Sequence, residues 1–221
     1  MALTERRNHA GNTLYPLYFQ YLSILFTEHY LTRYFDNKAA LCAELNHFLV
    51  DYNQEHLKQK GKQAEAHFIE PFKESELNKL AVWIATGGGK TLIMHVNILQ
   101  FQHYLKKSGK AKTFNRTILL TPNEGLSVQH KEEMDASNLD ADLFVKDGGS
   151  LFTQSSAQII DIHKLKEKSG DKTVAVESFE SNNLVLVDEG HRGASGVDWM
   201  AKRNQLCETG FSFEYSATFG Q

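Results

Sequence analysis

Residues 81–94 read AVWIATGGGKTLIM, in which an apolar run leads into three consecutive glycines, a Lys-Thr pair and a second apolar run. The first run predicts a strand because it is short and rich in β-branched and aromatic residues, and the second predicts the start of a helix. Gly87, Gly88 and Gly89 let successive backbone N–H groups turn toward one point, where the helix N-terminus adds positive partial charge. The stretch therefore predicts a binding loop for nucleotide phosphates.

The Lys-Thr pair defines the chemistry expected of this loop. In the pattern G-x-x-x-x-G-K-[ST], the lysine contacts the β- and γ-phosphates and the hydroxyl binds Mg²⁺, roles that fall here on Lys90 and Thr91. Ile84 stands where the pattern has its first glycine, so the match is incomplete. A tight strand-to-helix connection without a ligand is the alternative interpretation.

A second apolar run leads into two carboxylates. Residues 184–187 read LVLV and are followed by Asp188 and Glu189. A run without polar alternation is typical of a parallel strand buried on both faces, and open α/β sheets bind ligands at the carboxyl ends of such strands. Asp188 is suited to hold Mg²⁺, and Glu189 to orient and deprotonate an attacking water. For an Asp-Glu pair in isolation, a solvated turn is the alternative.

These segments resemble the DExH-box helicases and translocases of superfamily two. Residues 188–191, DEGH, resemble the DExH box, and residues 87–91 resemble the Walker A loop. Within the superfamily, PNEGLS at 122–127 and DEGHRG at 188–193 are most similar to the helicase part of type III restriction enzyme (Res) subunits and related defence helicases. The resemblance implies ATP and Mg²⁺ as cofactors and ATP hydrolysis as the activity, with Lys90, Asp188 and Glu189 as its catalytic residues.

The same resemblance implies sites for nucleic-acid contact. Residues 121–129 resemble motif Ia, which grips one nucleic-acid strand, and residues 216–218 resemble motif III, which couples nucleotide state to that grip. The residues expected to contact nucleic acid or to couple the two sites are Pro122, Asn123, Gln129, His191, Ser216 and Thr218. For His191, a local hydrogen bond that only shapes its loop is the alternative. Asp161 stands where the family often has a threonine that touches the nucleic-acid backbone, and its carboxylate would repel phosphate.

An aromatic-glutamine segment near the N-terminus is a candidate for reading adenine. Residues 14–20 read LYPLYFQ, which is similar to the family's adenine-reading pattern, although there the glutamine lies much nearer the Walker loop, so an inserted region must be assumed. A glutamine side chain offers one acceptor and two donors, which suit the N6 and N7 edge of adenine. A surface glutamine on an amphipathic helix is an equal alternative for Gln20, and Gln54, Gln59 and Gln63 are weaker competitors.

Composition narrows the class of protein. With 221 residues, 41% hydrophobic and 23% charged, the chain can bury one good core. A net charge of −3 argues against a nucleic-acid binder held by bulk charge. Cys42 and Cys207 lie too far apart in the sequence to suggest a disulfide framework or a zinc site. The sequence also shows no secretory signal and no membrane-spanning run. We therefore expect a cytoplasmic protein without a membrane partner.

The order of expected elements predicts an α/β fold, a RecA-like P-loop NTPase domain with a mainly parallel sheet and helices on both faces. The expected strands are 81–85, 117–121, 142–145, 157–162, 184–187 and 211–215. The expected helices are 18–31, 38–52, 91–105, 126–134 and 199–208, with 54–65 as a polar loop or helix end. We divide the chain into an N-terminal helical segment, 1–65, and a first RecA-like ATPase domain, 66–221.

The resemblance implies the first motor domain of an ATP-dependent helicase or translocase that acts on DNA rather than RNA, in bacterial restriction or phage defence. ATP is favoured over GTP because the chain lacks an Asn-Lys-x-Asp motif. Since the chain ends close to motif III, we expect it to be truncated before a second RecA-like domain of the same protein, and to hydrolyse ATP weakly or not at all alone. A methylation or nuclease partner is a further expectation. A nucleotide-dependent scaffold module and a protein-remodelling P-loop ATPase are the alternatives.

Overall fold

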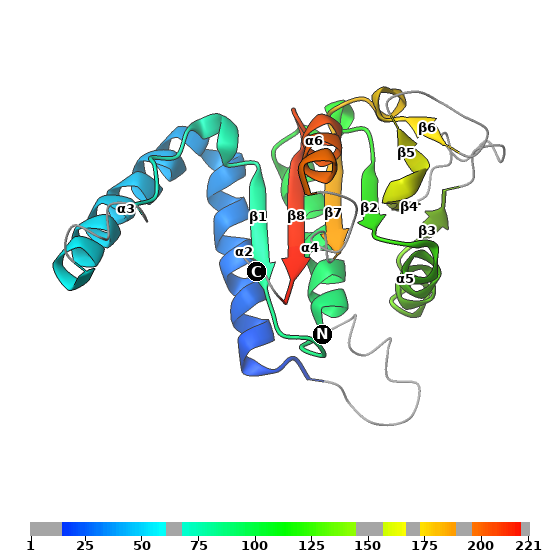
Figure 1. The fold of residues 1–221 in the computed structure, drawn as a ribbon, viewed down its shortest axis with the longest axis horizontal. Coiled ribbons are helices and arrows are strands. Elements are labelled where there is room, and N and C mark those ends of the chain that lie inside the picture. Colours follow the sequence, from blue (N-terminus) through cyan, green and yellow to red (C-terminus); the bar gives the residue numbers. More distant parts are fainter. Residues whose placement is uncertain (1–14, 61–67, 145–156, 167–172, 189–195, 218–221) are drawn as a thin grey trace.

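The computed structural model describes residues 15–60, 68–144, 157–166, 173–188 and 196–217. Its centre is a six-stranded sheet (Figure 1). The strands of this sheet are β1 (Lys79–Trp83), β2 (Thr117–Thr121), β3 (Ala141–Leu143), β4 (Ala157–Asp161), β7 (Leu184–Asp188) and β8 (Phe211–Ser216). They lie in the order β1-β8-β7-β2-β4-β3, and every neighbouring pair is parallel. A separate parallel pair joins β5 (Leu165–Lys166) and β6 (Val174–Ala175).

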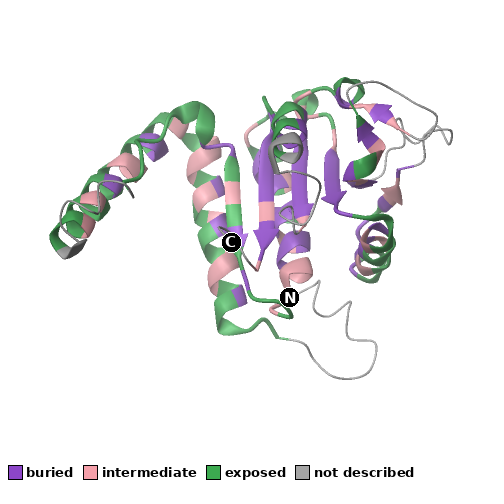
Figure 2. Ribbon diagram, in the orientation of Figure 1, coloured by how far each residue is buried: buried purple, intermediate pink, exposed green. Residues whose placement is uncertain are grey.

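Helices cover both faces of the sheet. The α-helices are α2 (Tyr18–Asp36), α3 (Lys38–Lys60), α4 (Lys90–Lys107), α5 (Glu124–Ala136) and α6 (Gly196–Leu206). Side chains alternate along a strand, so Leu119 joins the core under α2, α4 and α5, whereas Ile118 and Leu120 join the core under α6. Figure 2 shows the result, with buried central strands and more exposed outer helices. The predicted parallel α/β fold with helices on both faces is confirmed.

Parallel pairing brings distant segments to one edge of the sheet. β8 lies between β1 and β7, with Trp83 opposite Ser216 and Asp188 opposite Tyr215. All three strands therefore end at the same edge, where the glycine-rich connection to α4 begins. The sequence segments that carry the predicted chemistry are neighbours here, as expected for an open α/β sheet.

Helix α2 packs along α4 and begins near the same edge. Glu28 accepts hydrogen bonds from the Gln100 side chain, at 2.8 Å, and from the Tyr104 hydroxyl. These contacts fix α2 against the sheet domain, with its first turn beside the glycine-rich connection (Figure 1). Helix α3 extends away from the body of the molecule. None of the helices within the described ranges is long and apolar enough to cross a membrane.

The observed elements differ from expectation mainly at their ends. Strand β1 stops at Trp83. The next residue, Ile84, still donates its N–H to the Ser216 carbonyl at 3.1 Å, and Ala85 begins the turn, in which Gly88 N–H donates to the Ala85 carbonyl at 2.9 Å. Helix α3 continues to Lys60, so the polar residues 54–60 form its end. Residue 162 leaves β4 for a short 3₁₀ helix, and the pair β5 and β6 was not predicted because two-residue strands carry no periodic pattern.

Candidate functional site

The glycine loop, residues 85–89, has a backbone that admits few side chains. Gly87 and Gly89 have φ of 76° and 81°, the left-handed region that glycine tolerates best. A Cβ on Gly88 would lie 2.4 Å from Ile84 Cγ2 and 2.9 Å from the Ala85 carbonyl oxygen. The isoleucine that departs from the phosphate-binding pattern therefore fills the space beside Gly88, and the loop turns tightly around it.

The start of α4 supplies donors for an anion. The helix begins at Lys90, and its N-cap residue, Gly89, makes no side-chain capping hydrogen bond. N–H groups in the first turn of a helix have no partner within the helix, and the helix dipole adds positive partial charge. Lys90 and Thr91 lie half-buried in this first turn. Loop and helix start together fit a bound phosphate group.

Gln20 contacts the glycine loop from α2, although 68 positions separate the two partners in the chain. Its Nε2 donates to the Gly88 carbonyl at 2.8 Å, and its Oε1 accepts from Leu17 N–H at 2.8 Å. The residue is only 8% exposed. The competitor Gln54 is exposed on α3, the side chain of Gln59 lies outside the described part, and Gln63 lies outside the described residues. Gln20 is thus a loop-contacting residue, and its reading of adenine stays a prediction.

A hollow of about 340 Å³ opens between α2 and β1. Its lining consists of Phe19, Leu22, Ser23 and Phe26 from α2 and residues 81–84 from the other side. A ring carbon of Phe19 would lie 3.7 Å from a Cβ on Gly88, which places this end of the hollow beside the glycine loop. The α2 side of this hollow is therefore mainly aromatic and apolar.

Asp188 ends β7 and contacts a histidine that the sequence analysis did not select. Its Oδ2 lies 3.0 Å from His130 Nε2 in α5, with the two side chains 13% and 6% exposed. An ionised carboxylate only accepts hydrogen bonds, so His130 Nε2 donates. The selected neighbour, Gln129, is exposed. The signal that was missed is the spacing of three and four between the buried residues Ser127, His130 and Met134, which marks the inner face of α5.

The segment that resembles motif Ia is held by its own hydrogen bonds. Asn123 caps α5, because its Oδ1 accepts from Leu126 N–H at 2.9 Å, and Pro122 is buried. Asp161 similarly caps the following 3₁₀ helix by accepting from His163 N–H at 2.9 Å. Both side chains thus have structural partners, and contact of Pro122 and Asn123 with nucleic acid stays a prediction.

Hydrogen bonds connect the end of β8 to β1 and to α4. The Trp83 indole N–H donates to the Ala217 carbonyl at 2.9 Å, and the buried Ser216 closes the strand. One residue earlier, the Tyr215 hydroxyl accepts from the Asn97 amide of α4 at 2.8 Å. Complete burial raises the pKa of Tyr215 well above its ordinary value. The segment that resembles motif III is therefore tied to β1 and to the helix that starts at the loop.

Three predicted site residues, Glu189, His191 and Thr218, lie outside the described residues. Of the others, the structure brings Gln20, residues 87–91, Asp188 and Ser216 to one edge of the sheet. Among the residues described, no group of three or more His, Cys, Asp or Glu side chains could hold a metal on its own. Magnesium coordination by Thr91 and Asp188 stays a prediction.

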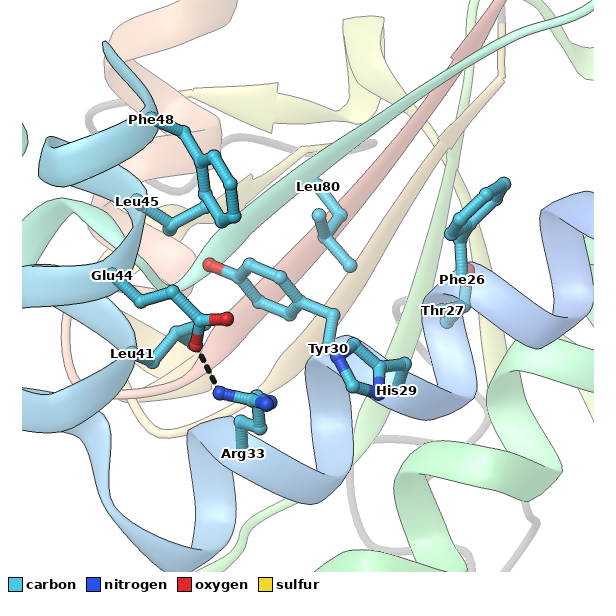
Figure 3. Close-up of a pocket in the computed structure, with 10 residues that line it drawn as sticks. All are labelled: Phe26, Thr27, His29, Tyr30, Arg33, Leu41, Glu44, Leu45, Phe48 and Leu80. Carbon is cyan, nitrogen blue, oxygen red and sulfur yellow. Dashed lines mark hydrogen bonds and ion pairs between the residues drawn. The ribbon is translucent and has the colours of Figure 1, made fainter. Parts of the chain in front are cut away.

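A second pocket, of about 310 Å³, lies between α2, α3 and β1 (Figure 3). Its lining is largely apolar, with an ion pair between Arg33 and Glu44 at one side. Tyr30 projects into it and donates its hydroxyl to the Leu77 carbonyl at 2.7 Å, and burial raises the pKa of Tyr30 above its ordinary value. None of the predicted site residues lines this pocket.

The chain is similar to one family of known proteins and to solved structures. The family described as "Type III restriction enzyme, res subunit" matches residues 48–221. The UvsW helicase of bacteriophage T4 is 14% identical, with a TM-score of 0.43 over 64% of this chain and 47% of its own. A nuclease-deletion mutant of the type ISP restriction-modification enzyme LlaGI, solved with a DNA substrate mimic, is 15% identical, with a TM-score of 0.39 over 76% of this chain and 17% of its own.

The chain spans less than half the length of either solved protein. None of the curated proteins matches it. The family match covers most of the chain, including the glycine loop, residues 188 and 189, and the end of β8. The chain therefore belongs to the family of type III restriction enzyme Res subunits.

Proposed function

We propose that this chain binds Mg²⁺-ATP at the glycine loop and serves as the first motor domain of a DNA helicase or translocase. The observation that carries the proposal is the convergence of the loop, Asp188 and the end of β8 at one edge of a parallel sheet. These are the elements that phosphoryl transfer needs, because its catalysis depends on positioning and charge stabilisation.

Within this proposal each residue has a separate task. Lys90 and the first-turn amides of α4 bind the β- and γ-phosphates, and Gln20 keeps the loop in place through Gly88. Thr91 and Asp188 hold Mg²⁺, which when bound offsets negative charge on the phosphate oxygens. Glu189 orients the attacking water and accepts its proton.

Contact with nucleic acid is assigned to the segments after β2 and β8. Pro122, Asn123 and Gln129 would grip one strand, while His191, Ser216 and Thr218 would transmit the nucleotide state. Helix α5 supports such coupling, because it begins beside Asn123 and carries His130 against Asp188. DNA is the expected track because the family consists of restriction enzyme subunits.

The division of the protein is also proposed. Residues 1–65 form a helical segment and residues 66–221 the first RecA-like domain, with a second such domain of the full-length protein completing the motor. That domain would supply an arginine finger, which is worth about 10³ to 10⁵ in rate, so residues 1–221 alone should hydrolyse ATP slowly. A role in restriction or phage defence, a methylation or nuclease partner and a cytoplasmic location belong to the same proposal.

The decisive experiment measures nucleotide binding and hydrolysis with a matched pair of lysine variants. Lys90→Ala should abolish binding of a fluorescent ATP analogue to residues 1–221, whereas Lys107→Ala, at the far end of the same helix, should leave it unchanged. In the full-length protein, ATP hydrolysis should rise on addition of DNA and be lost in the Lys90 variant.

Other outcomes would favour the alternatives. Binding without hydrolysis in the full-length protein, with or without DNA, would favour a scaffold module. Hydrolysis that neither DNA nor RNA stimulates would favour a protein-remodelling ATPase. Nucleotide binding that survives Lys90→Ala would contradict the site itself.

A further inference from the structure

His130 is a buried polar side chain to which the proposed chemistry gives no task. It is 4% exposed on the inner face of α5, and its Nε2 lies 3.0 Å from Asp188 Oδ2. Its other ring nitrogen, Nδ1, is buried without a hydrogen-bond partner among the described residues. Among the described residues the ring thus has one polar partner, and this partner is the predicted metal ligand.

We infer that His130 is a positioning residue for Asp188, which it orients so that the second carboxylate oxygen, Oδ1, stays available to Mg²⁺ or to its water ligands. This inference rests on the proposed function. His130 Nε2 contacts Oδ2, so the hydrogen bond fixes one carboxylate oxygen and thereby the orientation of the whole carboxylate group. Outer partners that orient a metal ligand in this way typically contribute about 10- to 100-fold in metal affinity.

The surrounding structure holds the histidine firmly. At the start of α5, Asn123 caps the helix, and the Ser127 and Thr121 hydroxyls are 2.6 Å apart in a buried contact. At the other end, Met134 is fully buried in the core. His130 lies between these anchors on the same face, so its ring has a fixed position relative to the end of β7.

The same arrangement links the metal site to the segment that resembles motif Ia. His130 lies seven residues after Asn123, on a helix of 13 residues that begins directly beyond that cap. A shift of α5 would move the donor that holds Asp188 Oδ2. His130 would thereby connect the position of α5 to the orientation of the metal ligand.

The test measures the magnesium requirement of nucleotide binding rather than turnover. A fluorescent ATP analogue is titrated onto the full chain in EDTA and then at increasing Mg²⁺ concentration. We expect His130→Ala and His130→Leu to bind the analogue in EDTA as the wild type does, but to need about 10- to 100-fold more Mg²⁺ for the Mg²⁺-dependent gain. His130→Gln, whose amide nitrogen can replace Nε2 as the donor, should restore most of the loss.

His47→Ala is the matched control, because His47 is exposed on α3. An unchanged magnesium requirement in the folded Ala and Leu variants would overturn the inference. So would an equal loss of binding with and without Mg²⁺, or unfolding of both variants, since either result means that the histidine is only structural.

Failure of this inference is distinguishable from failure of the proposed function. If Lys90→Ala abolishes analogue binding while the His130 variants keep a normal magnesium requirement, only the role of His130 is wrong. If Lys90→Ala binds the analogue normally, the nucleotide site itself is wrong.

Discussion

Replacing Gln20 tests whether α2 holds the glycine loop in its binding conformation. Gln20→Ala removes two hydrogen bonds, one to Leu17 N–H and one to the Gly88 carbonyl, each 2.8 Å long. A neutral hydrogen bond contributes about 1 kcal/mol net, so we expect the free energy of unfolding to fall by about 2 kcal/mol. For a chain of this size the loss lowers Tm by about 4–8 °C.

Gln20→Glu isolates the contact with the loop. The glutamate keeps an acceptor for Leu17 N–H, but it places a carboxylate oxygen where the amide donated to the Gly88 carbonyl. Two acceptors then face each other, and the charge lies beside the proposed phosphate site. We expect a loss of at least about 1 kcal/mol at pH 7 and a larger loss of ATP-analogue affinity than in Gln20→Ala.

Thermal unfolding and analogue titration of both variants are compared with Gln54→Ala, which alters an exposed glutamine on α3 and should change stability by less than about 0.5 kcal/mol. The reasoning is refuted if both Gln20 variants unfold and bind the analogue like the wild type. If only stability falls while analogue affinity is unchanged, Gln20 anchors α2 but does not shape the loop.

Three further predictions concern the framework around the site. Gly210→Ala would place a Cβ 2.0 Å from the Asn183 carbonyl oxygen. Because that oxygen belongs to the backbone and cannot swing aside, we expect a loss of about 3 kcal/mol or more in urea unfolding, and a loss below about 1 kcal/mol would contradict this. Tyr215→Phe removes the hydroxyl that accepts from the Asn97 amide, 2.8 Å away, and should lower the free energy of unfolding by about 1–3 kcal/mol. Adding Asn97→Leu should recover part of that loss, because no buried donor is then left without a partner. Strictly additive losses in the double variant would rule out the pairing. Burial raises the pKa of Tyr34 to about 12, against about 10 in the unfolded chain. The folded state therefore holds this proton more tightly, and the free energy of unfolding should fall as pH rises from about 10 to 12. Tyr34→Phe should weaken this pH dependence in unfolding curves, and an unchanged dependence would count against the reasoning.

Much of the fold follows from local sequence. Residues 117–121 were predicted as a strand with the observed bounds, because an uninterrupted apolar run suits a strand buried on both faces. The strand predicted at 184–187 ended one residue too early, since Asp188 still pairs with Tyr215 at the end of β7. Strand and helix ends are less certain because they depend on which backbone groups find partners in the adjoining turn, as the Ala85 carbonyl does with Gly88 N–H.

The sequence indicated the candidate site only as separate segments of the chain. Lys90 and Asp188 each stand in a recognisable local pattern, and a parallel sheet brings the carboxyl ends of its strands to one edge. That they flank β8 depends on strand order, which the spacing of apolar residues does not specify. The incomplete loop pattern at Ile84 was explained only by the packing of that side chain against Gly88.

The sequence by itself determined the parallel α/β fold and the glycine loop that begins a helix, because both depend on residues close together in the chain. Only the tertiary structure decided that Gln20 meets Gly88 across 68 positions and that His130 meets Asp188 across 58. Such contacts depend on how α2 and α5 dock onto the sheet. Docking is set by the packing of the whole core, so no local pattern along the chain encodes it.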